Sequence, residues 1–152
     1  MSFDRTNTTD LLALQSEVAT DPISMGYAAV VDNTQALLDL LNIPANNVGN
    51  DTILKPIEEL EIPEVAGVID ETEYSAASAY DKIWVEMLIN QNSDVSLGPF
   101  VTKFLEIFPG GSTTTTAVQA LRVKDASRAE ILFGVNTLIT RDDWIAARDY
   151  VS

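Results

Sequence analysis

Apolar residues recur at spacings of three and four along most of the 152-residue chain, in segments separated by proline, glycine and asparagine. This spacing places them on one face of an α-helix, and each break stops the helix from continuing. The pattern predicts helices over residues 7–20, 32–41, 71–91, 97–108, 113–124 and 126–133, and a last helix from residue 141. We therefore expect a mainly α protein, a compact bundle of about six helices that forms a single domain over residues 1–152.

Side-chain orientations and helix ends follow from the same pattern. Thr8 or Thr9 is expected to cap the first helix, and Asp21-Pro22 to end it in a turn shaped by Gly26 and anchored by Tyr27. The helix over 71–91 is predicted to be the central core helix, with an inward stripe of Tyr74, Ala77, Tyr80, Trp84, Met87 and Leu88. In the next helix the inward residues are Val101, Phe104, Leu105 and Phe108. Thr140 and Asp143 form a near capping box for the last helix.

Residues 43–70 interrupt the helical pattern with three prolines, two glycines and several asparagines. We predict one long irregular acidic loop or arm here, with a single turn at residues 56–60. Its acidic residues alternate with apolar ones and are candidate interaction residues: Glu58, Glu59, Glu61 and Glu64. The segment either lies along a partner or packs as a surface loop, and its carboxylates are either a weak cation site or a solvated face.

The stretch "FPGGSTTTT", residues 108–116, raises the possibility of a phosphate-binding loop. Such a loop needs a lysine directly after its last glycine and a strand before it. Here the first lysine is Lys124, and the preceding segment is helical in pattern. We interpret the stretch as a helix–helix junction, in which Gly110 or Gly111 adopts the left-handed conformation and residues 112–114 cap the next helix.

The charge is strongly negative and unevenly distributed along the chain. There are 23 acidic and 9 basic side chains, a net charge of −14, and residues 1–76 hold 14 of the acids against only Arg5 and Lys55. We expect no direct contact with nucleic acid or a membrane surface, because both are bound through Lys and Arg. A basic protein or a divalent cation suits the first half, although such charge can also serve solubility alone.

One basic cluster stands out, formed by Arg122, Lys124 and Arg128. Acidic residues interrupt it, so it makes a poor nucleic-acid footprint. Two interpretations remain open: salt bridges within the chain, or contacts with a neighbouring acidic subunit. In the second, the more basic half of one copy meets the acidic half of the next, and such head-to-tail contacts can close into a homo-oligomeric ring.

The chain contains no cysteine and no histidine. This excludes disulfides, thiolate catalysis, Ser-His-Asp triads and the usual zinc sites. A calcium-loop likeness at residues 90–101 fails, because Val95 and Val101 replace the required glycine and glutamate. We predict no catalytic, cofactor-binding or metal site and therefore no enzyme. With no signal peptide and no apolar stretch near membrane length, we expect a soluble protein.

Two stretches resemble a set of small, largely uncharacterised structural-module proteins of tailed bacteriophages. They are "TDPISMGYAAVVDNTQALLDLLN", residues 20–42, and "FPGGSTTTTAVQALRVKDASRAEILFGVNTLITRDDWIAARD", residues 108–149. Ser24 stands where those proteins commonly have glycine, and residues 43–70 have no counterpart. The resemblance implies a non-enzymatic phage gene product, found in the virion and assembled in the host cytoplasm.

Within that class we favour a head-to-tail connector or adaptor ring subunit, because its length, helical character and uneven charge suit ring assembly. Its partners would be portal or tail subunits. The alternatives are a tail or tail-tip component, a capsid cement protein, a non-virion acidic protein that binds a basic host partner, and a carboxylate-based hydrolase.

Overall fold

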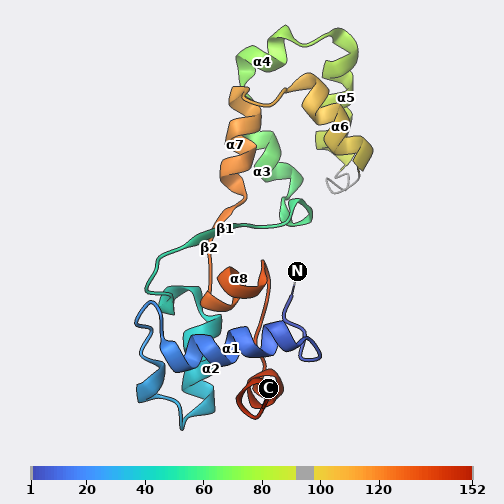
Figure 1. Ribbon diagram of the computed structural model, residues 1–152. Coiled ribbons are helices and arrows are strands. Elements are labelled where there is room, and N and C mark those ends of the chain that lie inside the picture. The colour runs from blue at the N-terminus through green and yellow to red at the C-terminus, as the bar shows by residue number, and fades with distance from the viewer. Residues whose placement is uncertain (1, 92–97, 152) are drawn as a thin grey trace. The chain divides into compact units, whose positions relative to one another are not determined.

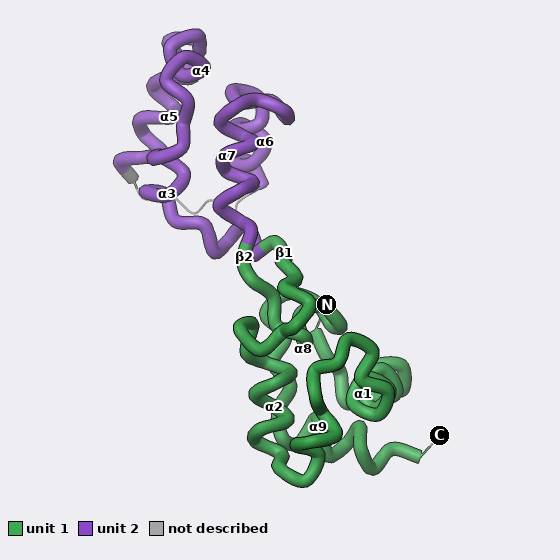
Figure 2. The backbone as a smooth tube through the Cα atoms, turned by 90° about the vertical axis from the view of Figure 1, so that its left-hand side faces the viewer, with its two compact units in different colours: residues 1–54, 124–152 green, residues 55–123 purple. Residues whose placement is uncertain are grey.

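The chain divides into two compact units in a computed structural model that describes residues 2–91 and 98–151. Unit 1 comprises residues 1–54 and 124–152, and unit 2 comprises residues 55–123 (Figure 2). Each unit has a hydrophobic cluster of its own. Helices dominate the described part of the chain, as predicted (Figure 1). The single domain stays a prediction.

Unit 1 is assembled from both ends of the chain. Its elements are α1 (Thr8–Thr20), the 3₁₀ turn η1 (Tyr27–Ala29), α2 (Thr34–Asn42), the 3₁₀ turn η2 (Pro44–Asn46), β1 (Thr52–Leu54), α8 (Arg128–Phe133) and α9 (Arg141–Arg148). Helix α1 packs on α9, and α2 packs on α8. The chain leaves and re-enters this unit through β1 and β2 (Val123–Asp125), which pair as a two-stranded sheet.

Local hydrogen bonds set the helix ends in unit 1. The side chain of Asn7 accepts from the Thr9 amide, so the cap lies one residue before the predicted Thr8 or Thr9. The predicted capping box between Thr140 and Asp143 is confirmed. The turn after α1 is confirmed as well: the Asp21 carboxylate accepts from the amides of residues 25 and 26, and Tyr27 is fully buried.

A buried ion pair joins the two parts of unit 1. Arg128 Nε donates to Glu17 Oε1 at 2.7 Å and Nη2 donates to Oε2 at 2.9 Å, and the two side chains are 11% and 3% exposed. The Tyr27 hydroxyl donates to the same carboxylate at 3.3 Å. Burial and then the Glu17 charge raise the pKa of Tyr27 well above its usual value, so this phenol stays protonated.

We expect Arg128→Met to lower the free energy of unfolding by about 3–5 kcal/mol, because it leaves the Glu17 carboxylate buried without its cation. Arg141→Met is the matched control: Arg141 is exposed and begins a helix of the same unit. The control should change stability by less than about 0.5 kcal/mol. Urea unfolding followed by circular dichroism measures both. Equal effects of the two substitutions would contradict a stabilising role for the ion pair.

Unit 2 contains η3 (Ile57–Glu59), α3 (Ile62–Gly67), α4 (Glu71–Ala76), α5 (Ala79–Gln91), α6 (Gly98–Ile107) and α7 (Thr113–Leu121). Helix α3 packs on both α5 and α7. The region 43–70 is therefore more regular than the predicted irregular loop: the turn at 56–60 is present as η3, but η2, β1 and α3 were not predicted. The predicted helix 113–124 ends at Leu121, where the chain turns into β2.

The predicted helix over 71–91 is two helices. Ala77 is extended, with φ −65° and ψ 153°, and ends α4. The Ser78 hydroxyl oxygen then accepts from the amide of Asp81, which is the pattern of a helix N-cap. Serine next to two alanines is compatible with a continuing helix, so the apolar period alone does not reveal this break.

The junction at residues 108–116 is structural, as predicted. Gly111 has φ +87°, and the Ser112 hydroxyl accepts from the Thr115 amide to cap α7. The Glu73 carboxylate accepts from the amides of Thr113 and Thr114 at 2.6 and 2.9 Å, and these hydrogen bonds lower its pKa. The amides at the start of α7 are thus occupied by side chains of this chain.

Gly111→Ala should destabilise the protein by about 1–2 kcal/mol, because an L-residue is strained at this left-handed φ. Gly110→Ala is the control, since Gly110 is the neighbouring residue and lacks a positive φ. A Cβ at either position meets no atom within 4 Å, so steric clash does not separate the two variants. Thermal unfolding of both checks the prediction, and an unaffected Gly111→Ala variant would contradict it.

Candidate docking site

The three residues of the predicted basic cluster are bound within the chain. Arg128 is paired with Glu17, as described above. Lys124 Nζ lies 2.8 Å from Glu130 Oε1. Arg122 donates from Nε to the carbonyl oxygen of Lys55 at 3.1 Å and from Nη1 to Gln119 Oε1 at 3.2 Å. Of the two interpretations left open, the structure favours contacts inside the chain.

The four predicted acidic interaction residues divide into two pairs. Glu61 and Glu64 form the capping box of α3, and Glu64 lies 3.9 Å from Lys55 Nζ. Glu58 and Glu59 are exposed in η3. Over residues 2–91 and 98–151, no three carboxylates converge as metal ligands would.

Folding evens out the charge that is uneven along the sequence. Unit 1 holds five basic and twelve acidic side chains, and unit 2 holds four basic and eleven acidic ones, so each has a net charge of −7. The reason is that the acidic N-terminal segment and the more basic C-terminal segment belong to the same unit. A head-to-tail contact between an acidic and a basic half of the molecule therefore loses its basis.

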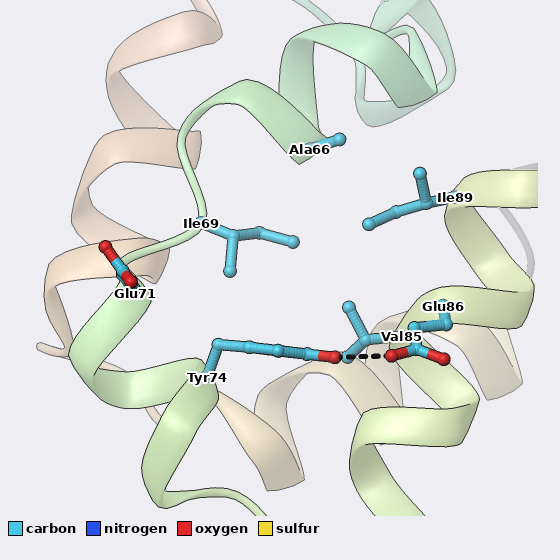
Figure 3. Close-up of a pocket in the computed structure, with 7 residues that line it drawn as sticks. All are labelled: Ala66, Ile69, Glu71, Tyr74, Val85, Glu86 and Ile89. Carbon is cyan, nitrogen blue, oxygen red and sulfur yellow. Dashed lines mark hydrogen bonds between the residues drawn. The ribbon is translucent and has the colours of Figure 1, made fainter.

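Unit 2 contains a pocket that combines an apolar lining with two carboxylates (Figure 3). It has a volume of about 270 Å³ and lies among α3, α4 and α5. Its lining is mostly apolar and consists of Ala66, Ile69, Glu71, Tyr74, Val85, Glu86 and Ile89. In the close-up, the side chains of Ile69 and Ile89 reach into the open space from opposite sides.

A tyrosine and a carboxylate close one side of this pocket. The Tyr74 hydroxyl donates to Glu86 Oε1 at 2.8 Å, the dashed contact in Figure 3. This hydrogen bond, followed by partial burial and the negative charge of Glu86, raises the pKa of Tyr74. The Lys82 ammonium lies 5.9 Å from the centre of the Tyr74 ring and donates to the Ser75 carbonyl oxygen. This hydrogen bond engages one oxygen of the Glu86 carboxylate, and the second oxygen accepts no hydrogen bond from the described residues.

A row of exposed apolar side chains runs along α5, on a different face from the pocket residues Val85 and Ile89. Tyr80, Ile83 and Met87 are 71%, 57% and 51% exposed, at the spacing of one helix face. The prediction that Tyr80 and Met87 face the core is therefore wrong. Leu88 is buried, as predicted, and Val85, which was not in the predicted stripe, is buried as well.

Tyr80 and Met87 were misassigned because α5 carries apolar residues almost all round its circumference, so the 3.6-residue period does not select one direction. Leu105 of α6 was also predicted to face inward. It is 44% exposed and lines a second, smaller hollow of about 160 Å³ in unit 2. Phe104 and Phe108 are buried, as predicted.

Comparison with known proteins adds no family to this description. No protein-family model matches the chain, and no curated protein or solved structure is significantly similar to it. Among the described helices, none has the length and apolar character needed to cross a bilayer.

Glu86→Gln should lower the pKa of Tyr74, because glutamine keeps a hydrogen-bond acceptor but removes the negative charge that opposes tyrosinate formation. Absorbance titration of tyrosinate measures the change, and Tyr74→Phe identifies which part of the curve belongs to Tyr74. Glu58→Gln is the control, since Glu58 is an exposed glutamate of the same unit outside the pocket. Coinciding curves for the wild type and Glu86→Gln would contradict the described contact.

Proposed function

We propose that this protein is a non-enzymatic structural component of a tailed-bacteriophage virion, and specifically a head-to-tail connector or adaptor subunit that binds portal or tail subunits. The phage assignment is supported by the resemblance of residues 20–42 and 108–149 to phage structural-module proteins. The observation that carries the docking role is the exposed apolar row of α5.

The exposed row favours a protein that assembles with others. Single exposed apolar residues are ordinary, but a contiguous set on one helix face commonly marks a protein–protein contact. Tyr80, Ile83 and Met87 offer an aromatic, a branched and a flexible side chain, types that are frequent at the buried centres of interfaces. A subunit of a particle would cover such a row on assembly.

A tail or tail-tip component fits the same observations. The net charge of −14 also favours a second candidate, a non-virion acidic protein that binds a basic host partner. In that case the same face would be covered by a host protein, and the chain would not accompany the particle. Location in the particle therefore separates the two functions.

Quantitative mass spectrometry of purified phage particles tests the proposal, with the copy number of this chain measured against that of the major capsid protein. We expect a copy number that corresponds to one ring. A copy number near that of the capsid protein would place the chain on the capsid surface instead. Absence from the particle would overturn the virion function and favour the acidic host-binding protein.

A further inference from the structure

We propose that the pocket among α3, α4 and α5 binds the side chain of a lysine in a basic segment of a neighbouring protein. The identity of that neighbour as a particle subunit rests on the proposed function. The binding chemistry rests on the pocket itself, whose wall is apolar and whose rim carries two carboxylates.

The apolar lining suits the hydrocarbon part of a lysine side chain. Ile69, Val85 and Ile89 surround the open space, and the ring of Tyr74 lies along one side of it (Figure 3). Long cationic side chains commonly bury their methylene groups against such surfaces while the charged end remains near the rim. Ile89 is 39% exposed, so covering it with a lysine stem would remove apolar surface from water.

The carboxylates supply the charge that a lysine requires. Glu86 lines the pocket, and the hydrogen bond from Tyr74 engages its Oε1 while Oε2 has no described hydrogen-bond partner. Glu71 lines the pocket from α4, and none of the described hydrogen bonds or ion pairs involves its carboxylate. The one carboxylate oxygen left by the Tyr74 contact suits the single-point contact of an ammonium group. A guanidinium binds best to both oxygens, which would place it in competition with Tyr74.

The surrounding charge favours a basic partner over a second copy of this chain. Residues 58–73, which include α3 and the start of α4, hold seven acidic side chains and no basic one. Each copy has a net charge of −14, so two copies that meet at this acidic face would repel each other. A basic segment would be attracted to it.

Three capped tripeptides test the proposal on the full-length protein: Ala-Lys-Ala, Ala-norleucine-Ala and Ala-Glu-Ala. The first two share an aliphatic stem and differ in the terminal ammonium. In ¹H–¹⁵N NMR titrations, we expect the lysine peptide to shift the amide signals of Ile69, Tyr74, Glu86 and Ile89. The norleucine peptide should bind more weakly, and the glutamate peptide should leave these signals unchanged.

Variants of the protein identify the groups responsible. Glu86→Gln should weaken binding of the lysine peptide by about threefold, the scale of a solvent-exposed ion pair. Asp32→Asn, at an exposed acidic residue of unit 1, should leave it unchanged. Should Glu86→Gln disturb the fold, Glu71→Gln provides the same test at the opposite rim. Equal binding of the lysine and norleucine peptides, shifts at other residues, or equal effects of the pocket and control variants would overturn the proposal.

The pocket assignment and the proposed function can each fail without the other. If the lysine peptide does not bind but the chain is present in particles, the pocket assignment alone is overturned. If the lysine peptide binds but the chain is absent from particles, the pocket assignment stands and its partner is a host protein.

Discussion

The ion pair between Glu17 and Arg128 ties together two parts of the sequence that are 111 residues apart. Both charges are nearly removed from water, which is costly unless each has its partner in good geometry. The bidentate contact and the Tyr27 hydroxyl meet that requirement. Unit 1 therefore forms only when the N-terminal and C-terminal segments come together, and residues 55–123 build a second core between them in sequence.

This arrangement also determines how the acidic and basic side chains are distributed between the two units. Because the acidic and more basic ends of the chain share one unit, the molecule has no acidic half and basic half to drive head-to-tail contact. Many carboxylates also serve the fold itself: Glu17 pairs with Arg128, Glu73 caps α7, and Asp143 caps α9. Where Glu71 and Glu86 line an apolar hollow, the negative charge instead faces outward and is available to a basic partner.

The sequence predicts those features that depend on neighbouring residues. The cap at Thr140, the glycine junction before α7 and the turn at Asp21 were correctly expected, because each is made by hydrogen bonds over a few residues. The break between α4 and α5 was missed, since serine and alanine carry no strong stop signal. Tyr80 and Met87 of α5 were also wrongly placed in the core, because apolar residues surround that helix.

The division into units and the pocket could not be predicted from the sequence. Which segments share a core depends on contacts between distant residues, such as Glu17 and Arg128, and neither spacing nor composition reports these. The pocket draws on three helices, and its central contact joins Tyr74 to a glutamate twelve residues away across a helix break. A lone tyrosine and glutamate at that separation form no recognisable motif.

The central claim is that the pocket among α3, α4 and α5 contacts a basic neighbour in the assembled particle. Carbodiimide cross-linking of purified particles tests it most directly, since this reagent joins a carboxylate to a lysine amine only when the two are in contact. We expect Glu86 or Glu71 to be coupled to a lysine of a different particle protein. Cross-links to that protein from other carboxylates of this chain, with none from Glu71 or Glu86, would contradict the account.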